Sequence, residues 1–368
     1  MLRVLHIMGC SDAGGISSVV RSFYEFIDRS EFHFDIALTV PEQGQNSRAL
    51  EKLGAKIFFI PMKAEDREGF CKALTNLLTE GHYDAVHVHE SETCYVALRI
   101  ATQLGIPCRI AHAHTTSPYE GVRGVIRRWS GCLLNYVYAT HVIGCGQKAG
   151  ERVFGKLNMK RPRAVVLPNG VDTERFSYRP ALRAQVRQEL QAENTFLLGM
   201  VCRLSEEKNI SFAIDLMAEV LERIPNAMLM IVGNGPEQEA LEQKIRERKL
   251  ENSVCLLGRR EDVDRLYQAF DLVLMPSFHE GFPVVAVEAM AAGLPVLLSD
   301  TITRELSFGS GVRYLPLDKM EAWVEAVSSF RQDENREKRQ ADVKKQGLDI
   351  RQTVKKLEQI YRQDVSGT

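Results

Sequence analysis

Short runs of β-branched and other apolar residues alternate with amphipathic helical windows along almost all of this 368-residue chain. Such alternation is typical of βαβ units, in which helical right-handed crossovers join parallel strands. A first series of strands is expected at 2–8, 32–40, 55–60, 84–88, 108–113, 141–145 and 164–167, with a helix over 16–28. The first half of the chain therefore predicts a doubly wound parallel sheet.

The alternation restarts after the turn-forming cluster Pro168-Asn169-Gly170-Val171-Asp172. Further strands are expected at 196–202, 227–232, 253–257, 272–275 and 295–298, with helices at 210–223, 237–249, 262–270, 284–292 and 319–330. We expect an α/β protein with two Rossmann-like domains, 1–172 and 173–345, facing each other across a cleft. Ligands of open α/β sheets lie at the carboxyl ends of the strands.

The end of the chain, 346–368, predicts one more helix over 350–362. Its apolar positions, Val354, Leu357, Ile360 and Tyr361, form one stripe. A single amphipathic helix must cover its stripe, so we expect this one to pack back on the first domain.

Composition narrows the class of protein. The net charge of −1 gives no global attraction to nucleic acid. No apolar stretch reaches the roughly 18 residues of a membrane span, and the start of the chain lacks the features of a signal peptide. None of the eight cysteines forms a Cys-x-x-Cys pair, so a zinc ribbon is not expected. A cytoplasmic protein, peripheral to a membrane at most, is expected.

Two glutamates mark the clearest candidate site. Glu280 lies in the loop after the strand 272–275, and Glu288 lies in the helix that follows Pro283. Proline suits a first helical position, and loop N–H groups beside a helix start favour an anion. Two carboxylates at such a site can accept hydrogen bonds from sugar and ribose hydroxyls, although a helix-end acid that complements the dipole is equally compatible with the spacing.

Cations and glycines follow other strands. Arg203 and Lys208 lie in the loop after the strand 196–202, and together they match a diphosphate, although two solvated surface cations would look the same. Gly14 and Gly15 follow the first strand and would let a backbone approach a phosphate or sugar, but an ordinary tight turn explains them as well.

Four histidines end two neighbouring strands: His87, His89, His112 and His114. The His-x-His spacing puts two rings on one face of a strand. No carboxylate cluster or cysteine pair completes a metal site, so no metal is expected there. We expect one or two of these histidines to contact substrate hydroxyls and the others to be core residues.

Several searches for catalytic motifs are negative. The chain has no Gly-x-Ser-x-Gly elbow and no P-loop, which argues against a serine hydrolase and a P-loop NTPase. It also has no Asp-x-Asp strand end to hold a divalent metal, so cationic side chains would have to neutralise a leaving diphosphate.

Residues 121–163 carry nine Lys or Arg and one acid, Glu151. Within them, Ile126, Trp129, Leu133 and Val137 fall on one helical stripe. A core-facing stripe with a solvated cationic face is one interpretation. The other is a helix that lies on an anionic membrane or a site for a phosphate-bearing lipid acceptor.

Taken together, these motifs resemble glycosyltransferase family 4 over nearly the whole chain. The resemblance is carried by the glycines 14–15, the turn 168–172, and the segments 201–209, 231–236, 257–259, 276–283 and 288–296. It implies the GT-B fold, whose last helix crosses back to the first domain. It also implies α-retaining hexosyl transfer from a nucleotide-sugar, usually a UDP-sugar, without a metal or other cofactor.

The resemblance also implies roles for particular residues. Arg203 and Lys208 would hold the diphosphate, Glu280 would contact sugar hydroxyls, and Glu288 would contact the ribose. His114 would be the cleft histidine, with His112 as the alternative. The other residues expected around the donor are Gly14, Gly15, Gly233, Arg259, Gly281, Phe282 and Pro283.

The sequence departs from the family at Cys202, where glycine is common, and after the strand 295–298, where Thr301-Ile302-Thr303-Arg304 replaces a glycine pair. The variant from Ser299 to Glu305 is similar to bacterial enzymes of exopolysaccharide or capsule assembly, so a glycan or polyprenyl-lipid-linked acceptor is expected. Two rival functions remain at this point: a nucleotide-sugar 2-epimerase and a non-catalytic sugar-nucleotide-binding scaffold.

Overall fold

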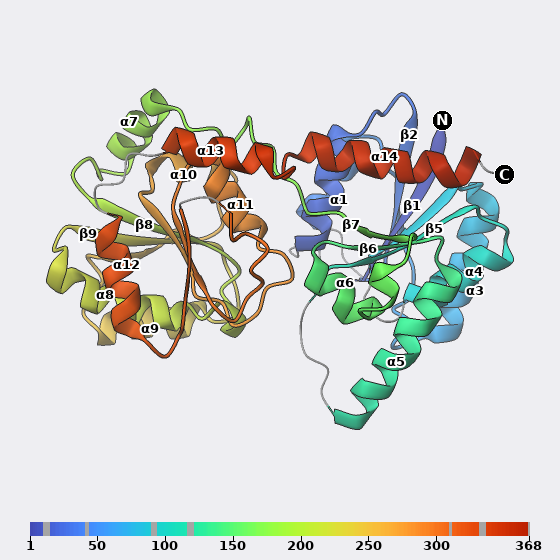
Figure 1. Ribbon diagram of the computed structural model, residues 1–368, viewed down its shortest axis with the longest axis horizontal. Helices are drawn as coiled ribbons and strands as arrows, with labels where there is room; N and C mark the ends of the chain where they lie inside the picture. The colour runs from blue at the N-terminus through green and yellow to red at the C-terminus, as the bar shows by residue number, and fades with distance from the viewer. Residues whose placement is uncertain are drawn as a thin grey trace. The chain divides into compact units, whose positions relative to one another are not determined.

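The computed structural model describes residues 1–9, 15–40, 44–89, 94–115, 121–308, 311–330 and 336–366, and gives only the backbone for 121–123, 125–127 and 366. The chain divides into two compact units. Unit 1 comprises Met1–Asn169 with Ile350–Thr368, and unit 2 comprises Gly170–Asp349. These limits lie within a few residues of the expected boundaries. Each unit is built on its own parallel sheet (Figure 1).

Unit 1 holds a seven-stranded sheet in the order β3-β2-β1-β4-β5-β6-β7, and every pairing is parallel. The strands are β1 (Leu2–Met8), β2 (Phe32–Leu38), β3 (Ile57–Phe59), β4 (Ala85–Val88), β5 (Cys108–Ala113), β6 (His141–Gly144) and β7 (Ala164–Val166). The helices are α1 (Gly15–Phe26), α2 (Gln45–Lys52), α3 (Arg67–Gly81), α4 (Cys94–Gln103), α5 (Gly121–Tyr138), α6 (Gln147–Phe154), the 3-10 turn η1 (Asn158–Lys160) and α14 (Ile350–Ser366).

Helices cover both faces of this sheet, which is why its strands are apolar almost throughout. Successive residues of β1 point to opposite faces: Val4 packs with α1 and α14, whereas Leu5 packs with α3 and α4. The predicted stripe of the last helix is buried in the first of these layers, and the Tyr361 hydroxyl lies 2.7 Å from Nδ1 of His87. The expectation that this helix packs on the first domain is confirmed.

Unit 2 holds a six-stranded parallel sheet in the order β10-β9-β8-β11-β12-β13. Its strands are β8 (Phe196–Val201), β9 (Ala227–Val232), β10 (Val254–Leu256), β11 (Leu272–Met275), β12 (Val296–Ser299) and β13 (Val312–Leu315). Its helices are α7 (Pro180–Glu189), η2 (Glu206–Lys208, 3-10), α8 (Ile210–Arg223), α9 (Gln238–Glu247), α10 (Val263–Ala269), α11 (Val284–Ala291), α12 (Met320–Ser329) and α13 (Arg336–Lys345).

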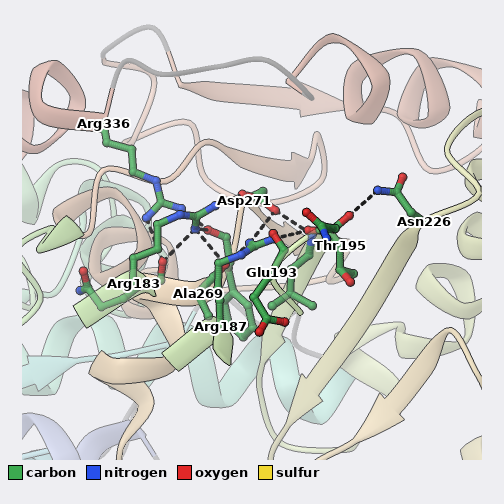
Figure 2. A network of polar contacts seen from close by, with 12 residues as sticks. Arg183, Arg187, Glu193, Thr195, Asn226, Ala269, Asp271 and Arg336 are labelled. Atoms are coloured by element: carbon green, nitrogen blue, oxygen red, sulfur yellow. Dashed lines mark hydrogen bonds and ion pairs between the residues drawn. The ribbon is translucent and has the colours of Figure 1, made fainter. Parts of the chain in front are cut away.

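A network of arginines joins α7, α10 and α13 where β11 begins. Figure 2 shows Arg183, Arg187 and Arg336 gathered around Asp271 and the last carbonyl groups of α10. Arg183 donates to the carbonyls of Gln268, Ala269 and Phe270 at 2.9 Å each. These contacts satisfy helix-end carbonyls that have no partner within the helix. The network stabilises unit 2 at the amino end of β11, the end away from the candidate site.

Two general expectations concern the whole chain. No helix in the described part is both long and apolar enough to cross a membrane. No disulfide joins any two of the described cysteines.

Candidate functional site

The order of strands in unit 2 places a ligand site between β8 and β11. From β8 the chain winds outward through β9 and β10, and it then returns to pair β11 with the other edge of β8. Open α/β sheets bind ligands at the carboxyl ends of the two strands where the order reverses. Arg203 and Lys208 follow β8, and Glu280 follows β11. The fold therefore brings the loops that carry these three residues to one edge.

Lys208 and Glu280 form an ion pair across this edge. Lys208 Nζ lies 2.9 Å from Oε1 of Glu280, and the two side chains are only 19% and 12% exposed. Burial opposes the charge on Lys208, but the Glu280 carboxylate outweighs burial and raises the pKa of the lysine. The lysine is thus a fixed cation at neutral pH.

Arg203 is the exposed neighbour of this pair. Its side chain has no hydrogen-bond or ion-pair partner within the described part of the chain, while Leu204 beside it is buried and anchors the loop. A fixed ammonium and an available planar guanidinium suit an anion with several oxygen atoms, such as a diphosphate.

Backbone hydrogen bonds join the loops after β8, β9 and β10 into one ledge. Leu204 N donates to Asn234 O at 2.9 Å, and Gly233 N donates to Gly258 O at 2.8 Å. Gly233 has φ +140°, and a Cβ there would stand 1.8 Å from the carbonyl oxygen of Cys202. Only glycine fits this close approach. Glycine at position 233 thus allows the loops after β8 and β9 to approach each other this closely.

Arg259 follows Gly258, which has φ +64°, and its side chain is exposed at the β10 end of the ledge. It lies two strands away from the reversal point between β8 and β11.

The segment Gly281-Phe282-Pro283 leads into α11. Phe282 and Pro283 are buried, and Gly281 is half-buried. Pro283 is the N-cap, with φ −81° and ψ 78°, one position before the first helical residue, and the helix begins at Val284, the start of the predicted range 284–292. A cap residue keeps extended ψ while its carbonyl already accepts helical bonds, here from Ala286 N at 3.0 Å.

Glu288 lies in α11, and its carboxylate contacts a residue that sequence reasoning missed. The Tyr267 hydroxyl of α10 donates to Oε2 of Glu288 at 3.1 Å. Burial raises the pKa of the Glu288 carboxyl to about 7, although this hydrogen bond works in the opposite direction. The structure describes no contact between Glu288 and Glu280, so the two glutamates occupy separate positions on α11 and its leading loop.

In unit 1 the strand order reverses between β1 and β4. Gly14 lies outside the described residues. Gly15 is the first residue of α1, and a Cβ added to it would meet no atom of the described residues within 4 Å. Packing against the described part of the fold therefore does not require glycine at this position.

The histidines of unit 1 form a buried cluster that includes one member the sequence did not indicate, His6 of β1. His6 Nδ1 lies 2.9 Å from His89 Nε2, and His89 Nδ1 lies 3.0 Å from His114 Nε2. A second chain runs from Tyr361 through His87 to His112, with 3.1 Å between the two histidines. The histidine at β1 sits opposite those of β4 because the strands pair in register, His6 with His87.

Burial keeps these imidazoles neutral. It lowers the pKa of His6 and of His114 to about 3, and it holds the pKa of His87, His89 and His112 well below the usual value. Two sets of three, His6-His87-His89 and His89-His112-His114, bring ligand nitrogens within 4.8 Å of one another.

His89 contacts His6 and His114, and His87 contacts Tyr361 and His112, so each of these two neutral rings can donate through one nitrogen and accept through the other. Nε2 of His6 and Nε2 of His112 are buried and have no hydrogen-bond partner among the described residues. Among the five, His114 is partly exposed, whereas His112 is buried.

Comparison with known proteins gives concordant matches. The family model described as glycosyl transferases group 1 matches residues 183–347, and the model described as Glycosyltransferase Family 4 matches residues 13–175. EpsF of Bacillus subtilis (strain 168), described as a glycosyltransferase, is 32% identical over 343 residues, which are 89% of this chain and 87% of EpsF.

Two further matches carry more specific descriptions. An Escherichia coli protein named UDP-Gal:alpha-D-GlcNAc-diphosphoundecaprenol alpha-1,3-galactosyltransferase is 27% identical over 81% of this chain and 79% of its own. The crystal structure of Anabaena HepE in complex with UDP superposes with a TM-score of 0.82 at 21% identity, covering 99% of this chain and 100% of HepE. The fold of the whole chain is therefore shared with HepE.

Proposed function

This chain belongs to glycosyltransferase family 4, and on that premise we propose that it transfers a sugar from a UDP-sugar to a lipid-linked glycan with retention of the α configuration. The observation that carries the proposal is the group at the reversal point of the second sheet. There the buried Lys208–Glu280 pair lies in the same pair of loops as the exposed guanidinium of Arg203.

In the proposed mechanism the two cations stabilise the leaving diphosphate. Negative charge builds up on the diphosphate as the bond to the sugar breaks, and cations fixed beforehand stabilise that charge most strongly. Glu280 holds Lys208 in place and accepts hydrogen bonds from sugar hydroxyls. The acceptor hydroxyl attacks from the face that the diphosphate leaves, and a phosphate oxygen takes its proton.

Names of related proteins support the choice of donor and acceptor. HepE was crystallised with UDP and with UDP-glucose, and the Escherichia coli relative is named for a UDP-galactose donor and an undecaprenol diphosphate acceptor. We propose a polyprenyl-diphosphate-linked sugar as the acceptor class, in surface polysaccharide assembly at the cytoplasmic face of a membrane.

The proposal is tested by incubating the protein with single UDP-sugars and an undecaprenyl-diphosphate-linked sugar in the presence of EDTA. We expect UDP release, an α-linked product and unchanged rates with EDTA, because Arg203 and Lys208 supply the positive charge that a metal would otherwise supply. Loss of transfer in EDTA with recovery on adding a divalent ion would contradict the metal-free mechanism. Conversion of a UDP-sugar to its 2-epimer without acceptor would instead support the rival epimerase.

A pH profile tests the role of Glu288. Its carboxyl is half-protonated near pH 7 because burial raises its pKa to about 7. A ribose hydroxyl donates to the ionised form, so binding should favour ionisation. Between pH 6 and pH 8 the ionised fraction, and with it the affinity for UDP, should rise by roughly tenfold.

Calorimetric titration of UDP across this range is the measurement, with Glu288→Gln as the matched control. The variant should bind more weakly than the ionised wild type and show no such rise. An equal rise in the variant would exclude Glu288 as its source.

A further inference from the structure

Helix α5 presents an apolar face to solvent. Trp129, Leu133 and Val137 are four residues apart and therefore lie on one side of the helix, and they are 74%, 63% and 56% exposed. The core-facing interpretation of this stripe is wrong for these three residues. The side chain of Ile126, the fourth predicted member, lies outside the described residues.

A fourth exposed apolar residue extends this surface. Leu157, which precedes η1, is 78% exposed. The neighbouring Asn158 donates from Nδ2 to the carbonyl oxygen of Cys132 at 3.3 Å, which fixes η1 against α5. We name Trp129, Leu133, Val137 and Leu157 the α5 apolar face.

Cations flank the α5 apolar face. The guanidinium groups of Arg161 and Arg163 stack over the Tyr136 ring of α5, at 5.1 and 4.4 Å from its centroid. Lys156 and Lys160 are exposed on either side of Leu157 and its turn. Clustered exposed cations around a large aromatic residue are typical of surfaces that meet anionic headgroups.

The charge of the chain is strongly uneven. Residues 121–163 carry nine Lys or Arg and one acid, a net of +8. Because the whole chain carries −1, the remaining residues carry −9. An anionic surface would attract this segment and repel the rest of the chain, and so would orient the protein.

We propose that the α5 apolar face inserts into the interface of a membrane rich in anionic lipids, with the flanking cations on the headgroup phosphates. Tryptophan prefers the headgroup level of a bilayer, and leucine and valine bury in the acyl chains next to it. In Figure 1 the first turns of α5 extend past the other elements of unit 1. This surface is separate from the proposed donor site, and its binding to lipid requires neither UDP-sugar nor acceptor.

The chain has only two tryptophans, which makes the proposal directly measurable. Trp129 is 74% exposed, whereas Trp323 is buried and donates from Nε1 to Pro316 O at 3.0 Å. Titrating the full chain with vesicles of 70:30 phosphatidylcholine and phosphatidylglycerol should shift the fluorescence to shorter wavelength. Trp129→Phe should remove the shift while sedimentation with the vesicles persists.

Substitutions separate the contribution of the apolar side chains to vesicle binding from that of the cations. Trp129→Ser with Leu133→Ser should lower vesicle binding by roughly tenfold or more, because it removes the inserted side chains. Lys156→Glu with Lys160→Glu should lower vesicle binding similarly at low salt and weaken its salt dependence. Phe59→Ser is the matched control, because Phe59 is also half-exposed on unit 1 but lies on β3. This variant should bind the vesicles as well as the wild type does.

Three outcomes would contradict the proposal. Failure to sediment with the anionic vesicles at low salt would overturn it, as would equal binding by the Trp129→Ser, Leu133→Ser variant. If that variant instead abolished a concentration-dependent dimer seen without vesicles, the face would be a contact between two copies. Transfer to a short water-soluble acceptor should be unchanged in all these variants, so a failure of the donor-site proposal would be visible separately.

Discussion

An Arg203→Ala variant should fold as stably as the wild type and lose roughly 100- to 1000-fold in kcat/KM for sugar transfer. Stability should persist because the Arg203 side chain is exposed and has no partner within the described part of the chain. Rate should fall because the guanidinium offers forked donors to the charge that develops on the leaving diphosphate. Thermal unfolding and steady-state kinetics on one preparation check both halves of the prediction.

The role of Lys208 is tested with a single and a double variant, because removing Lys208 takes away the ion pair of the nearly buried Glu280 carboxylate. Lys208→Met should therefore lose both rate and stability. Adding Glu280→Gln should restore much of the stability but none of the rate. Arg246→Ala, an exposed cation of α9, is the matched control and should change neither. Recovery of rate in the double variant would exclude Lys208 from the chemistry.

Mild acid should unfold unit 1 before unit 2. The cause is the histidine cluster, in which His6, His87, His89 and His112 are buried and neutral. In the unfolded chain a histidine titrates near 6.5. The unfolded state therefore binds more protons as the pH falls below 6.5, and the free energy of unfolding decreases.

The expected loss is large. Each such histidine removes about 1.4 kcal/mol by pH 5.5, so four remove roughly 5–6 kcal/mol, which approaches the whole stability of a typical domain. Unit 2 holds one histidine, His279, which is exposed. Glu288 of unit 2 changes the free energy of unfolding in the opposite direction. Its carboxyl pKa is raised in the folded state, so folding becomes more favourable as the pH falls from 7 to 4.5.

Hydrogen exchange at pH 7.0, 6.0 and 5.5 resolves the two units. Amides of β1, β4, β5 and α14 should lose protection together, while those of β8 and β11 keep theirs. His6→Asn should reduce the pH dependence by about one proton. Protection in unit 1 that did not change over this range would show that the buried histidines do not govern its stability.

The sequence was most informative where burial is apolar and periodic. The strand Ala227–Val232 was predicted to the residue, because a strand covered on both faces is a continuous apolar run with sharp ends. Cys108–Ala113 was also predicted to the residue, although it contains Arg109 and His112. The last helix was predicted because its apolar residues recur at helical spacing and form one stripe.

Among the α-helices and strands of unit 2, three were not predicted: α7, α13 and β13. In α7 and α13 few apolar residues are buried, Val186 and Val343 among them, and arginines make many of the contacts. Arg336 and Arg339 of α13 are buried although charged, and Arg339 Nε donates to the Gly293 carbonyl at 2.7 Å. Arg183 and Arg187 of α7 reach Asp271 in the same way (Figure 2). Periodicity of apolar residues does not report such contacts.

The candidate site was predicted as a set of loops, and its pairings were not. Motif spacing located Lys208 and Glu280 but did not show that they form an ion pair, because 72 residues separate them. Tyr267 and His6 were missed, since each is an ordinary member of a helix or strand. Two signals were present: His6 lies on the strand next to His87 and His89, and Tyr267 lies on the helix before the Glu288 motif.

The central claim is that the edge between β8 and β11 binds the diphosphate of the donor. The most direct test is a crystal structure of this chain with UDP, grown in EDTA. We expect the diphosphate oxygens to lie within hydrogen-bond distance of Arg203 and Lys208. UDP bound elsewhere, with both side chains out of reach of its phosphates, would contradict it.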